Sequence, residues 1–402
     1  MKYLHRSLEL CFLEAARSFP VLLITGPRQV GKTTFLKHVN RDNRTYVTLD
    51  DPIIRNLAQE DPKLFMQRFP PPIIIDEIQY APELLSIIKI YVDENKTSGQ
   101  FWLTGSQAFH LMKNITESLA GRVAILNMLG FSMSELLGNG QGVRPFIPGV
   151  YGGGNGILLQ EIYKIIWRGS YPALTAANKS TRDLFYSSYI QTYLQRDVRD
   201  LANVGNERSF LNFLRGTAAR SGQLLNLNDL ARDANISPPT AKKWLSILEA
   251  SGIIYLLEPY FTNITKRIVK SPKLYFLDTG LCSYLGAWST PENLELGAAS
   301  GSIFETFVVS EIIKSYIHNG LKPPIYYYRD RDIKEIDLLI IENQTIYPIE
   351  IKKTMMPDKS SVKNFYLLEK LNLTIGSGAV ICLVDKELPI TSSVKAIPVN
   401  YI

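Results

Sequence analysis

The feature that most restricts the fold of this chain is a glycine-rich turn between an apolar run and a stretch of helical periodicity. The run Val21–Thr25 leads into Gly26-x4-Gly31-Lys32-Thr33. The glycines permit turns that aim successive N–H groups at phosphate oxygens, Lys32 supplies positive charge and the Thr33 hydroxyl can ligate Mg²⁺. The segment predicts a strand–loop–helix unit that binds nucleotide phosphates, against the alternative of a plain glycine turn. The residues predicted to bind nucleotide here are Gly26, Pro27, Arg28, Gln29, Val30, Gly31, Lys32, Thr33 and Thr34.

Short apolar runs alternate with helix-length spacers along the first 135 residues. The runs, which we interpret as buried strands, are 21–25, 46–49, 73–75, 101–104 and 123–126. Such alternation is typical of a parallel sheet with helices on both faces. The predicted fold class of this part is therefore α/β.

Two adjacent carboxylates follow the apolar run Ile73–Ile75. Asp76 is predicted to hold Mg²⁺, directly or through water, and Glu77 to polarise an attacking water. The alternative is a solvated turn after a buried strand. The phosphate-binding loop earlier in the chain favours the functional interpretation.

Three further side chains are candidates for this site. Thr104 or Ser106, at the end of the run 101–104, is predicted to lie between the two halves of the site and sense a γ-phosphate, unless the segment is only a strand-end turn. Arg122 is a candidate for an arginine that reaches a γ-phosphate, within the chain or across a subunit boundary. A surface arginine is the alternative for Arg122.

Charge, cysteine content and hydropathy exclude several classes of protein. The 44 basic and 38 acidic residues give a net charge of +6, which matters only where the basic residues cluster. The cysteines Cys11, Cys282 and Cys382 form no CxxC pair, so a zinc framework is not expected. There is no apolar stretch of about 18 residues and no signal-peptide core at the N-terminus. We expect a cytoplasmic protein without a membrane segment.

Composition divides the chain into five segments. A glycine-rich loop or linker at 138–156 follows the α/β part, residues 1–137, and residues 157–206 have a helical pattern. We place a small module of helices and strands at 207–275 and a mixed α/β domain at 276–402.

Residues 224–256 have the form of a helix-turn-helix. Ser237 is a good N-cap, Pro238 suits the first helical position, and Gly252 ends the second helix. The following strand begins a wing, and the module resembles a winged helix. Basic residues cluster on the second helix and on the wing-like stretch 263–277, and they predict contact with DNA phosphates, with a purely structural lid as the alternative. The candidates are Lys242, Lys243, Lys266 and Arg267, with Lys270 and Lys273 in the same stretch.

Carboxylates at apolar positions mark a second site near the C-terminus. Asp337 lies in the strand-like segment 336–341, and Glu350 and Lys352 share one face of the segment 345–352. Asp337 and Glu350 are predicted to share a Mg²⁺ or Mn²⁺ ion, and Lys352 to position water or stabilise charge. This arrangement resembles the PD-(D/E)xK nuclease core, which makes Glu305 the helix carboxylate. No proline precedes Asp337, so this half of the motif rests on Asp337 alone, and a domain used only for binding or assembly is the alternative.

Together these motifs resemble a bacterial and archaeal group in which an AAA-type ATPase is fused to a restriction-endonuclease-like domain. Gly26–Thr33 is then Walker A and Ile73–Glu77 is Walker B. The segments 118–122, 167–172 and 278–281 are also typical of that group. The resemblance implies ATP and Mg²⁺ as cofactors, DNA as a partner, and a homo-oligomer, with a hexamer as one form. The leading hypothesis is ATP hydrolysis coupled to work on DNA, with metal-dependent cleavage. A nucleotide-controlled assembly switch is the alternative, and a DNA-binding regulator without ATPase activity is disfavoured by Glu77.

Overall fold

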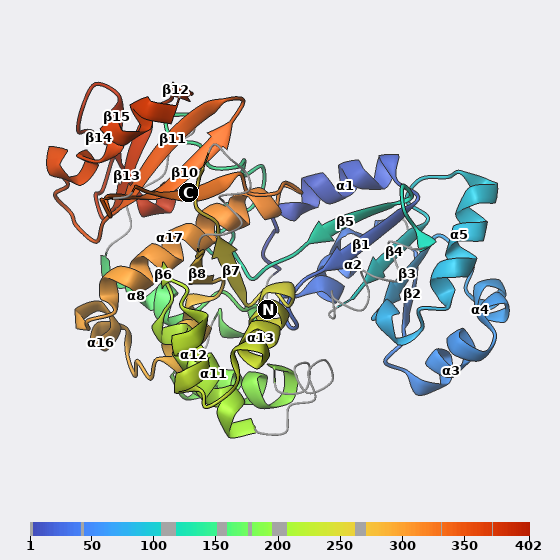
Figure 1. Ribbon diagram of the computed structural model, residues 1–402. Coiled ribbons are helices and arrows are strands. Elements are labelled where there is room, and N and C mark those ends of the chain that lie inside the picture. The colour runs from blue at the N-terminus through green and yellow to red at the C-terminus, as the bar shows by residue number, and fades with distance from the viewer. Residues whose placement is uncertain are drawn as a thin grey trace.

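The computed structural model describes residues 3–41, 44–105, 118–150, 159–175, 179–194, 207–261, 271–330, 332–371 and 373–402. Figure 1 shows an N-terminal α/β part, a middle part of helices around a small sheet, and a C-terminal part built on a larger sheet. In this view helix α17 (Ser300–Ile317) runs beneath the larger C-terminal sheet, and the helices of the middle part lie lower still.

The N-terminal part is built on five parallel strands in the order β2-β3-β4-β1-β5. Successive residues of β1 point to opposite sides, so that Leu22 and Ile24 enter one core and Val21 and Leu23 enter the other. The predicted parallel sheet with two covered faces is confirmed. The strands are β1 (Val21–Thr25), β2 (Thr45–Thr48), β3 (Ile73–Asp76), β4 (Phe101–Thr104) and β5 (Val123–Asn127), and the helices are α1 (Leu8–Ser18), α2 (Lys32–Val39), α3 (Pro52–Glu60), α4 (Pro62–Arg68), η1 (Ile78–Tyr80), α5 (Leu84–Asn95) and α7 (Met133–Leu136).

The middle part contains the module that resembles a winged helix. Its elements follow one another as helix, strand, two helices and two strands, and the strands form the antiparallel sheet β6-β8-β7. Ser237 caps α13 by accepting a hydrogen bond from the backbone N–H of Thr240, and Pro238 is the first helical residue. The winged-helix assignment stays a proposal. The elements are α8 (Leu159–Arg168), η2 (Pro172–Leu174), α9 (Lys179–Tyr189), η3 (Ile190–Leu194), α11 (Glu207–Ala219), β6 (Gln223–Leu224), α12 (Leu227–Asp233), α13 (Pro238–Ala250), β7 (Ile254–Leu257) and β8 (Lys273–Phe276).

Two short helices that we assigned to the C-terminal domain belong with this middle part. Helices α15 (Thr279–Leu285) and α16 (Pro291–Leu296) pack against α8. Asp278 holds them there, because its carboxylate accepts hydrogen bonds from the Ser170 hydroxyl at 2.7 Å and the Tyr186 hydroxyl at 2.8 Å. The domain boundary near residue 276 stays a prediction, and the two helices that follow it pack against α8 of the middle part.

The C-terminal part is a mixed sheet in the order β14-β15-β13-β11-β10-β9, with β12 beside β11. The predicted hairpin is present as β10 and β11, with a turn in which Asn343 and Gln344 have positive φ angles of 48° and 62°. Among the described residues, no helix is long and apolar enough to cross a membrane. The elements are α17 (Ser300–Ile317), β9 (Ile325–Arg329), β10 (Glu335–Glu342), β11 (Thr345–Ile351), η4 (Lys359–Val362), η5 (Phe365–Leu371), β12 (Thr374–Ile375), β13 (Gly378–Cys382), β14 (Leu388–Pro389), β15 (Val394–Pro398) and η6 (Val399–Tyr401).

Helix α17 contacts the C-terminal sheet and the N-terminal part at once. The described part of the predicted linker, residues 138–150, packs along it, with the Phe146 N–H donating to the Ser315 hydroxyl at 3.1 Å. Near α7, the Lys314 ammonium donates to the Phe131 carbonyl at 3.0 Å, and Glu311 accepts from the Met133 N–H at 2.6 Å. The glycine-rich segment is thus an anchored connection in its described part.

A fully buried carboxylate, Glu135, joins three segments of the chain. Its Oε1 lies 3.2 Å from Arg6 Nε and 3.4 Å from His318 Nδ1, and it accepts a hydrogen bond from the Ser7 N–H at 2.7 Å. Arg6 also donates to the Val30 carbonyl in the phosphate-binding loop at 3.0 Å. Burial alone would raise the pKa of Glu135, but Arg6 and His318 outweigh it and hold that pKa well below its ordinary value.

We predict that Glu135→Gln lowers the thermal stability of the chain strongly. The substitution leaves Arg6 buried without its ionic partner, and breaking a buried pair costs about 3–5 kcal/mol. Calorimetric unfolding measures the effect, with exposed Glu83→Gln as the matched control. Because a lowered carboxyl pKa stabilises the fold above its unfolded value of 4.5 and that stabilisation is lost on acidification, the two proteins should converge as the pH falls below about 4.5. Equal unfolding temperatures at pH 7 would contradict the proposed role of this carboxylate.

Candidate functional site

The phosphate-binding loop joins β1 to α2, as the sequence predicts. Gly26 has a φ angle of +136°, and a Cβ there would lie 2.1 Å from the Met128 carbonyl oxygen, so only glycine fits. Gly31, with φ +94°, starts α2 at Lys32. The Lys32 side chain is buried and donates to the carbonyls of Gly26 at 3.0 Å and Pro27 at 2.9 Å. The lysine is therefore held inside the curve of the loop, where phosphate oxygens would be bound.

Asp76, at the end of β3, accepts hydrogen bonds from the phosphate-binding motif and from the neighbouring strands β2 and β4. The Thr33 hydroxyl lies 3.0 and 2.9 Å from the two carboxylate oxygens, and the Tyr46 hydroxyl donates at 2.7 Å. The Thr104 hydroxyl makes a short hydrogen bond to the other oxygen. Oxygen donors in this arrangement fit Mg²⁺, which Thr33 and Asp76 would hold.

Thr104 connects Asp76 to the neighbouring Glu77. Strand β4 lies between β1 and β3, which brings the end of β4 between the two halves of the site. The Glu77 backbone N–H donates to the Thr104 hydroxyl at 3.0 Å, and the Gln79 side chain donates to the Glu77 carboxylate. Glu77 itself has a φ angle of +60°, a strained backbone conformation for a residue other than glycine. The position of Thr104 is as expected, and its role as a sensor stays a prediction.

The sequence interpretation missed Tyr46 and Asp50 beside this site. Burial, and after it the hydrogen bond to Asp76, raise the pKa of the Tyr46 hydroxyl. Burial and the charges of Glu77 and Asp76 raise the pKa of Asp50. Asp50 lies just beyond the end of β2, and the ends of parallel strands share one edge of a sheet, whereas Tyr46 is the second residue of that strand and reaches Asp76 through its long side chain. That rule was the signal that could have found Asp50.

An apolar cavity of about 540 Å³ opens beside the loop. Its lining combines the N-terminal segment, the loop, the start of α2 and the segment at η2, including Tyr3, Gly31, Thr34, Phe131 and Pro172. A flat apolar group attached to phosphates in the loop would fit there, which makes this cavity the candidate for the nucleoside. A second hollow of about 880 Å³, at α9, α11 and α15, contains none of the predicted site residues.

One predicted residue does not join the site within this chain, and another cannot be placed. Ser106 lies outside the described residues. Arg122 precedes β5, and its carbonyl bonds the N–H of Val21 at the start of β1, so it lies at the opposite edge of the sheet, about 16 Å of strand away. Its guanidinium pairs with Asp93 at 2.6 Å. Arg122 therefore does not reach the phosphate loop in its own chain, and a contact across a subunit boundary stays a prediction.

The hairpin of the C-terminal sheet brings Asp337, Glu350 and Lys352 together. Lys352 Nζ lies 2.8 Å from Glu350 Oε2 and 3.5 Å from Asp337 Oδ2. The Ile351 N–H donates to the same Asp337 oxygen at 2.8 Å. The predicted proximity is present, and the lysine is placed between the two carboxylates.

Glu305 takes part in a neighbouring cluster with Tyr275, Lys273 and Glu335. It accepts a hydrogen bond from the Tyr275 hydroxyl at 2.6 Å and pairs with Lys273 at 3.1 Å. Lys273 also pairs with Glu335 at 2.5 Å. Lys273 is therefore buried in ion pairs and is no candidate for DNA contact, contrary to its place in the basic stretch. Although all three are described, Glu305, Asp337 and Glu350 do not bring one oxygen each within 4.8 Å of one another.

Burial first, and then the neighbouring Asp337, raise the pKa of Glu350 to about 8. When both carboxylates are ionised, two negative charges face the single positive charge of Lys352. One proton or an added cation removes the excess. The cluster is consistent with a metal site and equally with a structural ion pair.

The predicted DNA contacts are only partly described. Lys242 and Lys243 are exposed on α13. Lys266, Arg267 and Lys270 lie outside the described residues. Exposure is compatible with phosphate contact and does not test it.

We predict that Mn²⁺ binding by the C-terminal cluster rises with pH. Because a cation must displace the Glu350 proton, the affinity for Mn²⁺ should increase roughly tenfold per pH unit up to about pH 8 and then level off. The stability of the chain without metal should change in the opposite direction, because ionisation of Glu350 lowers the free energy of unfolding as the pH rises from 4.5 to about 8. Calorimetric titration with Mn²⁺ measures the affinity, with Glu350→Gln losing the pH dependence and exposed Glu94→Gln retaining it. Identical binding by Asp337→Ala and the unmodified chain would make the carboxylates structural.

Three sequence families match successive parts of the chain. Residues 18–137 match the family described as AAA domain. Residues 159–292 match a domain of unknown function, DUF8612, and residues 300–402 match another, DUF4143. The last match does not assign a nuclease fold to the C-terminal part.

Two uncharacterized proteins, one from Mycobacterium bovis and one from Mycobacterium tuberculosis, are each 28% identical over 383 residues, which is 95% of this chain and 81% of theirs. A Walker-type ATPase of Pyrococcus abyssi is similar at 15% identity with a TM-score of 0.47, over 69% of this chain and 94% of that one. The Thermotoga maritima RuvB Holliday junction branch migration motor is similar at 17% identity with a TM-score of 0.26, over 62% of this chain and 86% of that one. The AAA match and the geometry of the loop agree, and the N-terminal region of the chain is an AAA-type P-loop ATPase region.

Proposed function

We propose that this chain hydrolyses ATP at its P-loop and couples hydrolysis to work on DNA, including metal-dependent cleavage by the C-terminal part. The observation that carries the ATPase proposal is the hydrogen-bonded group of Thr33, Asp76, Thr104 and Glu77 at the end of the sheet. This group combines a residue of the phosphate-binding motif, both Walker B carboxylates and a polar residue of β4, the strand between β1 and β3. The family match of residues 18–137 supports ATP binding and hydrolysis.

Each residue of this group has a distinct role in the proposal. Lys32 contacts the β- and γ-phosphates and stabilises their charge. Glu77 orients and polarises the attacking water, and the bond from its N–H to Thr104 fixes the backbone that carries it. Bound Mg²⁺ supplies charge neutralisation at the phosphates, and Thr33 and Asp76 are its candidate ligands.

The DNA half of the proposal rests on α13 and on the C-terminal cluster. Lys242 and Lys243 are exposed side by side on the second helix of the module, a position suited to phosphate contacts. The end of that helix abuts the P-loop, since a Cβ on Gly252 would lie 3.1 Å from the Pro27 ring. Asp337 and Glu350 are the candidate metal ligands, and Lys352 is the candidate for stabilising charge at a cleaved phosphate.

A nucleotide-controlled assembly switch is the second candidate. It is favoured by the buried network of Glu135, which pairs with His318, just beyond α17, and with Arg6, the donor to the P-loop carbonyl of Val30. On this view the ion pairs of Lys352 are structural, and the C-terminal part binds partners. ATP turnover with and without single-stranded, duplex and branched DNA separates the two: several-fold stimulation supports work on DNA, and slow turnover indifferent to DNA supports the switch.

We predict that Lys32→Ala weakens ATP binding, whereas Glu77→Gln keeps binding and abolishes turnover. The first change removes the positive charge inside the loop, and the second removes only the group that polarises water. Nucleotide binding by calorimetry and phosphate release by a coupled assay measure the two effects. Glu60→Gln, an exposed carboxylate on α3, is the matched control. Turnover by Glu77→Gln at the unmodified rate would refute the role of Glu77.

We predict that removing Lys242, Lys243, Lys266 and Arg267 weakens binding to all DNA sequences alike. Each lost phosphate contact should flatten the slope of log affinity against log salt by about one unit. Fluorescence anisotropy over a salt series measures the slope. The double variant Lys242→Gln/Lys243→Gln has a matched control in Lys63→Gln/Lys96→Gln. The control changes two exposed lysines of the N-terminal part. An unchanged slope in the quadruple variant would leave the module as a structural lid.

A further inference from the structure

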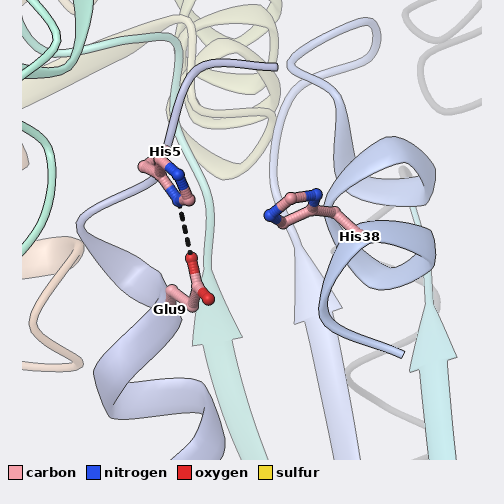
Figure 2. Close-up of side chains that lie close together, drawn as sticks. All are labelled: His5, Glu9 and His38. Carbon is pink, nitrogen blue, oxygen red and sulfur yellow. Dashed lines mark hydrogen bonds and ion pairs between the residues drawn. The ribbon is translucent and has the colours of Figure 1, made fainter. Parts of the chain in front are cut away.

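Two histidines and a glutamate that play no part in the sites above lie close together beside the P-loop helix. His5 and Glu9 come from the N-terminal segment and the first turn of α1, and His38 comes from the last turn of α2. One possible ligand atom of each lies within 4.8 Å of the others. Figure 2 shows the His5 ring above the Glu9 carboxylate and the His38 ring turned toward both. Within the described part of the chain, no other group of three His, Cys, Asp or Glu residues converges in this way.

Neighbouring side chains hold the three residues in place. The His38 ring stacks on Tyr3, with centroids 3.6 Å apart and planes inclined by 15°. The His5 ring meets the same tyrosine edge-on at 5.7 Å. The Glu9 side chain is only 11% exposed, and its Oε1 faces Arg41 at 3.7 Å while its Oε2 faces His5. Such outer contacts orient potential ligands and restrict the rotamers that they adopt.

The ligand set and its spacing suit a zinc-like ion. Two imidazole nitrogens and one carboxylate oxygen favour Zn²⁺ and related cations over Mg²⁺ or Ca²⁺, which prefer oxygen alone. With bonds of about 2.0–2.1 Å, neighbouring ligand atoms of a tetrahedral zinc ion lie about 3.3 Å apart. His5 Nδ1 and Glu9 Oε2 are 3.3 Å apart already. One ring nitrogen of His38, a residue exposed at the end of α2, lies within 4.8 Å of a ligand atom on each of the other two residues.

We propose that His5, Glu9 and His38 bind one Zn²⁺ ion, with a fourth position left for water. The ion joins the N-terminal segment to the last turn of α2, whose first residue is Lys32. Arg6 of the same segment already bonds the Val30 carbonyl at the other end of that helix. The zinc therefore clamps the P-loop helix against the N-terminal segment, and it is distinct from the Mg²⁺ that Thr33 and Asp76 would hold.

Binding of Zn²⁺ and Co²⁺ to the full chain tests the proposal, after chelator treatment and without nucleotide. We expect one strongly bound Zn²⁺ per chain by calorimetry, and visible absorption typical of tetrahedral Co²⁺ when cobalt replaces it. His38→Gln and His5→Gln should each weaken Zn²⁺ binding at least tenfold. Thermal unfolding without metal, measured for every variant, establishes that the substituted chains are folded.

Controls separate this site from other carboxylates. Glu14→Gln removes an exposed carboxylate from the same helix, α1, and should bind Zn²⁺ as the unmodified chain does. Asp337→Asn should also retain the ion, because the C-terminal cluster is elsewhere. Absence of tight Zn²⁺ binding, or equal affinity in His38→Gln and the unmodified chain, would overturn the proposal and leave a plain ion pair between His5 and Glu9.

Discussion

The neutralised charge of Glu135 is the interaction on which the arrangement of the domains depends. Its carboxylate is inaccessible to water and therefore requires partners, which it finds in Arg6 and His318. These residues belong to segments more than 100 positions apart along the chain. Because Arg6 also bonds the Val30 carbonyl, the N-terminal segment, the P-loop and the end of α17 share one buried polar network. Displacing the N-terminal segment would leave the buried charge of Glu135 without the counter-charge of Arg6.

This network makes α17 the element that relates the two candidate sites. Glu305 lies in its second turn, where it pairs with Lys273 beside the C-terminal cluster, and His318 immediately follows its last turn. Thirteen residues separate them, about 20 Å along a helix. The helix is buried along most of its length, so it is held as a rigid body between the sheet and the P-loop region. Through Arg6, Glu135 and His318, the P-loop carbonyl of Val30 is connected to the end of this helix.

The ion-pair clusters around Lys273 and Lys352 show how buried and partly buried carboxylates are accommodated. Lys273 neutralises Glu305 and Glu335, and Lys352 neutralises Asp337 and Glu350. Each lysine faces two carboxylates, and the resulting shortage of positive charge, together with burial, raises the pKa of Glu350. The same shortage is what would attract a divalent cation. Near the P-loop the negative charge of Asp76 is stabilised differently, by hydrogen bonds from the hydroxyls of Thr33, Tyr46 and Thr104.

The sequence by itself determined the parallel sheet, the loop at Gly26–Thr33 and the nearness of Asp337 to Glu350. Each of these depends on local rules: apolar runs make buried strands, glycine spacing makes the loop, and a hairpin pairs adjacent strands. Only the tertiary structure decided that Arg122 lies at the far edge of the sheet, that α15 and α16 belong to the middle part, and that Lys273 is buried. The same holds for the partners of Glu135. Such contacts join residues that are far apart in the chain. The hydrophobic periodicity of one segment shows which of its faces is buried, but it does not indicate which distant segment packs against that face.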